Sequence, residues 1–160
     1  MISSQNLGFM QGRLSPMIDG MIQRFPVTNW QNELEIAKLN NWNLMEWTID
    51  YYSFDKNPLI NKDFKSSSFS KIQIPSITAD FFMQKPFFLE ENSKEKNLLI
   101  NDFKKVLDTM IKLNIRFIVL PLVDNASIIN NNLDENLVID CLRTIFLDYE
   151  KYDIEFIFES

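Results

Sequence analysis

Two kinds of apolar pattern alternate along this chain. Short runs of consecutive apolar residues bounded by polar or turn-forming residues are typical of buried strands, whereas apolar residues three or four apart indicate helices with one buried face. The short runs predict strands at Leu7–Met10, Leu44–Asp50, Lys71–Ala79, Ile115–Val123 and Ile154–Ser160. Segments with helical spacing lie between most of them, so strands and helices are expected to alternate.

The clearest helical pattern spans Ser93–Asn114. Its apolar residues follow one another at alternating steps of four and three: Leu99, Phe103, Val106, Met110 and Leu113. These steps place all five on one helix face. A second segment, Leu59–Lys71, has scattered apolar residues and three consecutive serines, and it predicts only a short helix.

Capping motifs mark the start of two further helices. Thr28 with Gln31 matches a capping box, and so does Asn132 with Glu135. In the first helix, which should end near Asn40, the acids are expected on the solvent face and the apolar residues on the core face: Glu33 and Glu35 opposite Trp30, Leu34 and Ala37. The second helix has the expected apolar face Leu137 or Val138, Cys141, Ile145 and Tyr149.

A long loop is expected after Ala79, and it concentrates four aromatic residues: Phe81, Phe82, Phe87 and Phe88. Such a cluster forms either a lid or pocket wall, or a cover over the end of the core. The cover is the commoner role, because large apolar side chains are usually buried.

Alternating strands and helices without hairpin signals predict an α/β fold with a parallel sheet built from right-handed crossovers. Two closures are compatible with it: a doubly wound open sheet, or about five of the eight strands of a (β/α)8 barrel. A doubly wound nucleotide-binding protein should have a glycine-rich turn that opens its first helix. Here Gly8 and Gly12 have the wrong spacing and precede a loop, which favours the incomplete barrel.

Polar residues occur at or near the end of every predicted strand, namely Gln11 and Arg13, Glu46 and Asp50, Asp80, Asp124 and Asn125, and Glu159. In a barrel these ends share the catalytic rim. An amide beside a guanidinium suits a polyhydroxylated or anionic ligand, so we expect Gln11 and Arg13 to bind substrate. The alternative is a glycine turn with an Arg on the surface.

If these carboxylates converge, their mutual repulsion must be compensated, because two carboxylates about 4 Å apart repel by roughly 4 kcal/mol at an effective dielectric constant near 20. A shared proton, the Arg13 guanidinium or a divalent cation can supply it. Oxygen ligands without histidine suit Mg²⁺ or Mn²⁺. The alternative is that Asp50, Asp80 and Asp124 are loop or capping acids, an explanation that fits Glu46 and Glu159 less well because both lie in apolar strands.

Composition narrows the class of protein. With 160 residues, 46% of them hydrophobic, the chain is expected to form one globular domain over residues 1–160. A net charge of −6 without a basic run argues against nucleic acid as a partner, and the absence of histidine excludes a Ser-His-Asp triad within the chain. No export signal or membrane span is evident, and the lone Cys141 fits a reducing cytoplasm, more as a buried apolar residue than as a nucleophile.

Several motifs resemble the sugar phosphate isomerase/epimerase family of xylose-isomerase-like barrels. They are Gly8-Phe9-Met10-Gln11-Gly12-Arg13-Leu14-Ser15-Pro16, Gln23-Arg24-Phe25-Pro26, Asn29-Trp30, Met45-Glu46-Trp47, Asn57-Pro58-Leu59 and Thr78-Ala79-Asp80-Phe81-Phe82-Met83. The resemblance implies a barrel with a divalent metal at its carboxyl rim that interconverts sugars or sugar phosphates by proton transfer next to a carbonyl. It also implies that Glu159 is a metal ligand and an acid–base residue, with Gln11, Arg13, Glu46 and Asp80 at the substrate.

The family takes its other ligands, an Asp, a His and a second Glu, from strands six to eight, which we expect this chain to lack. Three interpretations therefore stay open: the front half of a metal-assisted isomerase or epimerase, a non-catalytic half-barrel completed by a partner chain, and a truncated product without activity. Self-association is expected as well, because Leu7–Met10 and Ile154–Glu159 would be open apolar sheet edges.

Overall fold

The computed structural model describes residues 7–21, 24–61 and 72–160. Within these residues the chain forms one parallel sheet whose strands are β1 (Gly8–Met10), β2 (Leu44–Thr48), β3 (Gln73–Thr78), β4 (Phe117–Pro121) and β5 (Glu155–Glu159). The helices are α1 (Trp30–Leu39), α2 (Asp80–Gln84), α3 (Ser93–Leu113) and α4 (Glu135–Tyr149), with short 3₁₀ turns at Phe54–Lys56 and Asp124–Ala126. The predicted α/β class and parallel sheet are confirmed.

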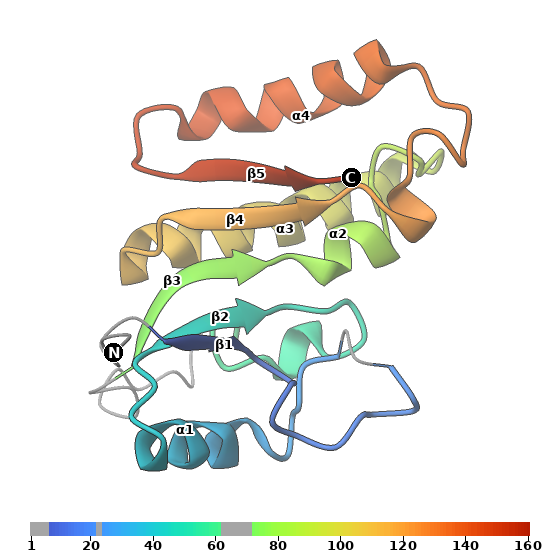
Figure 1. The fold of residues 1–160 in the computed structure, drawn as a ribbon. Coiled ribbons are helices and arrows are strands. Elements are labelled where there is room, and N and C mark those ends of the chain that lie inside the picture. The colour runs from blue at the N-terminus through green and yellow to red at the C-terminus, as the bar shows by residue number, and fades with distance from the viewer. Residues whose placement is uncertain (1–6, 22–23, 62–71) are drawn as a thin grey trace.

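The strands lie in the sheet in the same order as in the chain (Figure 1). Every neighbouring pair is parallel, and the register aligns Met10 with Glu46, Glu46 with Ser76, and Ser76 with Phe117. A doubly wound sheet reverses its strand order at a switch point, and the described strands contain no reversal.

The two faces of the sheet differ in character. Met45, Trp47 and Ile49 point to the helix side and are fully buried, as are Ile77 and Ile118, which lie in register with Trp47 across the next two strands. Figure 1 shows α3 behind the sheet and α1 and α4 at its two flanks. The alternate positions, including Glu46, Ser76 and Phe117, point to the opposite face and stay only half-buried. This opposite face carries both polar and apolar side chains.

The predicted helix over Ser93–Asn114 is confirmed. Its start is capped by the Asn92 side chain, which accepts hydrogen bonds from the N–H groups of Lys94 and Glu95. Its end is formed by Asn114 in the left-handed conformation, which asparagine adopts more readily than most residues.

The predicted capping boxes are wrong in detail. Asn29, not Thr28, precedes α1, and its side chain forms no cap. The Trp30 N–H, at the first position of the helix, bonds to the Pro26 carbonyl. Asp134 rather than Asn132 caps α4 by accepting the Asn136 N–H. The buried face of α4 also differs from the prediction at one position, since Leu142 is buried where Cys141 was expected.

The aromatic cluster after β3 covers the core. The segment predicted as a loop begins with helix α2, whose Phe81 N–H bonds to the Ile49 carbonyl, and continues into a turn. Its four phenylalanines are all buried, and Phe81, Phe82 and Phe87 pack against the Phe103 ring of α3. The interpretation as a core cover is therefore confirmed, whereas the loop prediction is wrong for Asp80–Gln84 and right for residues 85–92.

Most of the helix predicted over Leu59–Lys71 lies outside the described residues, and its first two residues form a turn. Just before it, buried Asn57 accepts the indole N–H of Trp47 and donates to the Thr48 carbonyl, which ties this segment to β2. Among the residues described, no helix combines the length and the apolar character needed to cross a bilayer.

Candidate functional site

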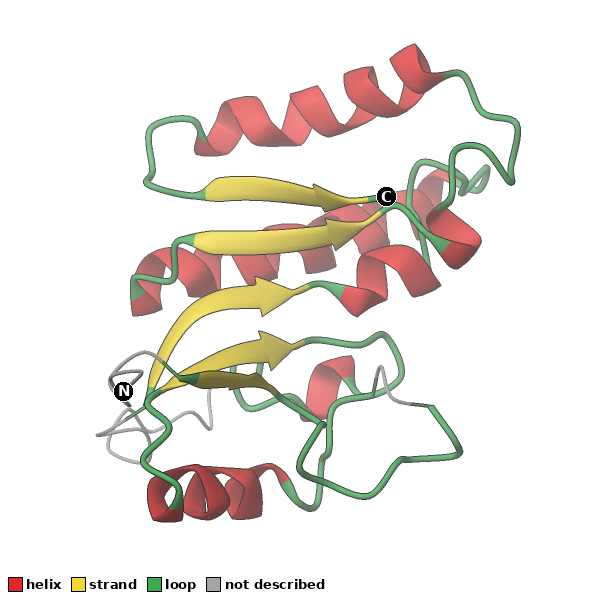
Figure 2. Ribbon diagram, viewed as in Figure 1, coloured by secondary structure: helices red, strands yellow, loops and turns green. Residues whose placement is uncertain are grey.

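The carboxyl ends of all five strands point to one edge of the sheet (Figure 2). The segments after β1 and β4 extend from this edge as loops, whereas α2 begins directly after β3. The residues predicted from the sequence as site residues therefore lie along one rim of the described structure. Their individual surroundings, however, differ strongly.

Gln11 lies in the sheet rather than in solvent. Its backbone N–H donates to the Glu46 carbonyl, its side-chain oxygen accepts the Thr48 N–H at 3.1 Å, and its carbonyl accepts the Thr48 hydroxyl. The residue is 1% exposed, and its side-chain Nε2 has no hydrogen-bond partner among the described residues. Half of this amide therefore joins β1 to β2, and the other half is a buried donor that has no partner among the described residues.

A buried carboxylate holds the turn that follows. Glu33 of α1 is fully buried, and its two oxygens accept the N–H of Gly12, both at 3.0 Å, and the N–H of Leu14 at 3.1 Å. The expectation that Glu33 faces solvent is wrong, because the turn supplies the donors that a buried carboxylate needs. Gly12 has a φ of 88°, a left-handed conformation that glycine adopts without strain.

Arg13 projects from this turn between the two residues that Glu33 holds. It is exposed, and its guanidinium lies 3.5 Å from the Met10 sulfur. The sequence indicated the turn through its glycines but gave no sign of the distant acid, which lies twenty residues away from Arg13 in the chain.

Glu46 points from β2 onto the uncovered face of the sheet. Its carboxylate accepts the Ser76 hydroxyl at 2.9 Å and the Thr78 hydroxyl at 2.6 Å, both from β3. A hollow of about 310 Å³ lies beside it, lined also by Met10 and Pro75. These two hydroxyl groups explain how an acid is tolerated in this strand. The sequence analysis did not predict that Ser76 and Thr78 bind Glu46.

Asp50 is a structural acid. It is fully buried and accepts the N–H of Phe25 at 2.8 Å, the N–H of Ser53 at 3.0 Å and the Ser53 hydroxyl. The Arg24 guanidinium lies 4.0 Å away. The loop-capping alternative thus describes Asp50 correctly in role, although the residue is buried rather than in water.

Asp80 is the most perturbed group of the rim. Its pKa is raised from 3.8 to about 7, above all by burial and also by the negative charges of Asp50, Glu159 and Glu46, while the Arg13 guanidinium acts in the opposite direction. The side chain is 2% exposed, and its Oδ2 has no hydrogen-bond partner among the described residues. Charges from the ends of β2 and β5 and from the turn after β1 therefore all act on one carboxyl group after β3.

Glu159 ends β5, is exposed, and lies in register with Pro121. The acid and amide after β4, Asp124 and Asn125, are exposed in a 3₁₀ turn. Within the described part of the chain, no three Asp, Glu or Cys side chains are placed to hold one metal ion. Glu159 alone does not make a metal site, so the residues present do not complete the expected coordination.

No protein-family model and no curated protein sequence matches this chain.

The Glu33 arrangement predicts a specific loss of stability. Replacing Glu33 with Gln removes the charge and turns an NH₂ group toward backbone N–H donors, which should lower the free energy of unfolding by roughly 2–3 kcal/mol. Urea unfolding measures this difference. Glu35→Gln is the matched control, because Glu35 lies on the exposed face of the same helix, where it pairs with Lys38, and its loss should be below about 0.5 kcal/mol. Equal effects of the two changes would contradict the buried role of Glu33.

The raised pKa of Asp80 predicts a pH-dependent stabilisation by Asp80→Asn. Between pH 3.8 and about 7 the unfolded chain ionises Asp80 while the folded chain does not, so this residue destabilises the fold increasingly as pH rises through that window. The penalty reaches about 4 kcal/mol above pH 7. The free energy of unfolding of the Asn variant, relative to the parent chain, should therefore grow by about 2–3 kcal/mol from pH 5 to pH 8. Asp124→Asn, at an exposed strand end, should show no such growth, and a pH-independent Asp80→Asn effect would refute the shift.

Proposed function

We propose that this chain forms the sugar-binding part of a (β/α)8-barrel isomerase or epimerase that acts on a sugar or sugar phosphate. The proposal is supported by five parallel strands that follow one another in chain order, as they do in such a barrel. It is supported further by a polar rim at the carboxyl ends of those strands, where barrel enzymes bind their substrates.

The observation that carries the proposal is the set of charges acting on Asp80. Charged groups from three segments influence its pKa: Glu46 and Asp50 in and after β2, Glu159 at the end of β5, and Arg13 in the turn after β1. Perturbed carboxyl groups of this kind concentrate at functional sites, because burying them without a functional use only costs stability. A substrate rich in hydroxyl groups would supply both donors and acceptors to such a rim.

Each predicted residue has a role in this proposal. The Gln11 Nε2 donates to a substrate oxygen, and the Arg13 guanidinium binds hydroxyl or phosphate oxygens. Glu46, already held by two hydroxyls, orients a substrate hydroxyl that donates to it. Asp80 is protonated for about half of the time near neutral pH, so it can donate a hydrogen bond to the substrate carbonyl.

Glu159 is the proposed base. It removes the proton from the carbon next to the carbonyl, while Asp80 passes its own proton to the carbonyl oxygen, which leaves a neutral enediol. Return of a proton to the neighbouring carbon, or to the opposite face of the same carbon, completes an isomerisation or an epimerisation. Glu159 would also give one ligand to Mn²⁺ or Mg²⁺, but no step here depends on a metal, since the described residues do not complete its site.

A second candidate is the non-catalytic half-barrel that assembles with a partner chain. It is favoured by one observation, namely that β5 pairs only with β4 in the described sheet and so presents an open edge. For both candidates we propose a cytoplasmic location, in keeping with the single thiol of Cys141, which cannot form a disulfide within the chain.

Arg13→Met tests the proposed site. A panel of aldoses, ketoses and their phosphates is titrated into the protein and followed by calorimetry, and proton exchange at the carbon next to the carbonyl is followed by NMR in D₂O. The variant should bind the best ligand about 10 to 100 times more weakly, because a charge-assisted contact is lost, with an unchanged melting temperature.

Lys38→Met is the control, since it removes the same charge from the exposed face of α1 and should leave binding unchanged. If no sugar of the panel binds, or if Arg13→Met lowers the melting temperature by several degrees without affecting binding, Arg13 has a structural role and the proposal fails.

A further inference from the structure

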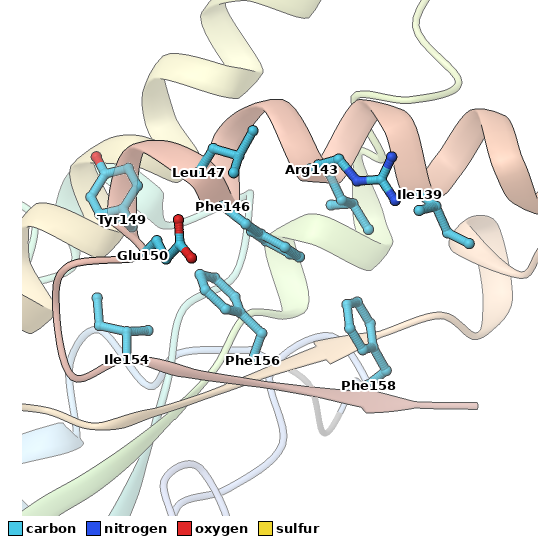
Figure 3. A pocket seen from close by; sticks show the side chains of 10 residues that line it. Ile139, Arg143, Phe146, Leu147, Tyr149, Glu150, Ile154, Phe156 and Phe158 are labelled. Carbon is cyan, nitrogen blue, oxygen red and sulfur yellow. The ribbon is translucent and has the colours of Figure 1, made fainter.

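Two hollows of the described structure differ in character and in position. Figure 3 shows an apolar groove between α4 and β5, in which Phe146 stacks on Phe156 with ring centroids 3.9 Å apart. β5 is the last strand in the order of the sheet, so this groove lies where a barrel adds its next strand and helix. The second hollow, of about 300 Å³, is polar, and its described lining includes none of the residues of the proposed site. We call it the rim pocket.

The rim pocket lies between the connections that follow β3 and β4. One wall comes from the end of α2 and the segment that leads into α3, and the other comes from the 3₁₀ turn after β4 and the loop behind it. The 3₁₀ turn packs against α2, and both connections leave the sheet at its carboxyl edge (Figure 1). Because β3 and β4 each pair with a strand on both sides, the pocket does not depend on an open edge of the sheet.

Gln84 and Glu90 supply the polar groups of the first wall. The Gln84 Oε1 accepts the Tyr51 N–H at 2.8 Å, which fixes the plane of this amide beyond the end of β2. One oxygen of Glu90 accepts the Asn92 N–H at 2.9 Å. A carboxylate has about four lone-pair sites, so Glu90 can accept further hydrogen bonds from a ligand.

Asn125 and Asn131 supply the polar groups of the facing wall. The Asn131 Nδ2 donates to the carbonyls of Asn125 and Ser127, at 3.0 and 2.7 Å, and so closes the loop on itself. Because the amide nitrogen is used within the loop, the amide oxygen is the group that Asn131 offers to a ligand. Asn125 is exposed and brings an amide that both donates and accepts hydrogen bonds.

The rest of the lining adds an apolar surface and balanced charge. Leu99 is buried and Leu89 is half-buried. Lys85, whose ammonium lies 5.6 Å from the centre of the Tyr51 ring, balances the negative charge of Glu90. A volume of about 300 Å³ is at the small end for ligand pockets. The lining therefore suits a small ligand with hydroxyl groups at its edge, an apolar face and no net charge, which describes a sugar ring.

The rim pocket begins one helical turn away from Asp80. Asp80 is the first residue of α2 and Gln84 is the last, so the two lie four residues apart on the same face of the helix. The rise between them is about 6 Å, which is comparable to the width of one sugar ring.

We propose that the rim pocket binds a neutral sugar ring, namely the second ring of a substrate whose reacting ring lies at Asp80. This assignment rests on the proposed function and narrows the substrate to sugars that carry a second, glycosidically linked ring. The hydroxyl groups of that ring donate to Glu90 and to the Asn131 oxygen and bond to the Asn125 amide, while its apolar face packs on Leu89 and Leu99.

Calorimetry with four neutral disaccharides tests the assignment: cellobiose, maltose, lactose and lactulose, each compared with the monosaccharide of its reducing end, glucose or fructose. At least one disaccharide should bind about tenfold more tightly than its monosaccharide. Asn125→Ala should weaken that disaccharide about 3- to 10-fold, because a hydrogen bond between neutral groups is lost, and leave the monosaccharide affinity and the melting temperature unchanged. Asn130→Ala is the matched control, an exposed asparagine of the same loop outside the pocket lining, and it should change neither affinity.

The results also distinguish the rim pocket from the site at Asp80. If a monosaccharide binds and no disaccharide binds more tightly, or if Asn125→Ala and Asn130→Ala have equal effects, the rim pocket does not hold a second ring, and the proposed function stands without it. If Asn125→Ala weakens a disaccharide and Arg13→Met does not, the rim pocket is a carbohydrate site and the proposed reaction site fails. Failure of every sugar to bind overturns both.

Discussion

The buried carboxylate of Glu33 determines the course of the chain after β1. A charge removed from water must be surrounded by donors, and the backbone N–H groups of Gly12 and Leu14 are the donors this carboxylate has. The turn is therefore held at the residues on either side of Arg13. Because the turn is held there, Gln11 reaches back to β2 and the Arg13 side chain leaves the sheet at its carboxyl edge. The donor half of the proposed binding site thus depends on one acid of α1.

Each acid of the rim must likewise be compensated for its removal from water, and the three acids Asp50, Glu46 and Asp80 are compensated in different ways. Asp50 is surrounded by donors and serves the fold. Glu46 accepts two hydroxyl groups from β3 and keeps one side toward a hollow. Asp80 has no donor at its Oδ2 within the part of the chain that the structure describes, and it keeps its proton to a higher pH. The number of hydrogen-bond donors around each carboxylate distinguishes structural acids from candidate functional ones better than burial does. Asp50, a structural acid, is buried even more completely than Asp80.

The sequence predicted the layers of this protein better than its contacts. Periodicity located α3, because Leu99, Phe103 and their neighbours alternate with charged residues, and it located the parallel strands. It failed at Glu33, since the spacing of an acid on a helix does not reveal a distant turn that requires a carboxylate. The helix directly after β3, α2, was mistaken for loop because its phenylalanines lack helical spacing. The rim itself followed from topology, as parallel strands end at one edge, but the neutral state of Asp80 depends on three-dimensional burial.

The central claim is that acids from separate strands act together on Asp80. The most direct test follows the side-chain carboxyl carbon of Asp80 by NMR between pH 3 and pH 9, in the parent chain and in the Glu159→Gln variant. The account predicts a midpoint near pH 7, lowered in the variant because one of the charges that raise the pKa is gone. A midpoint near 3.8 in the parent, or one that Glu159→Gln leaves unchanged, would contradict it.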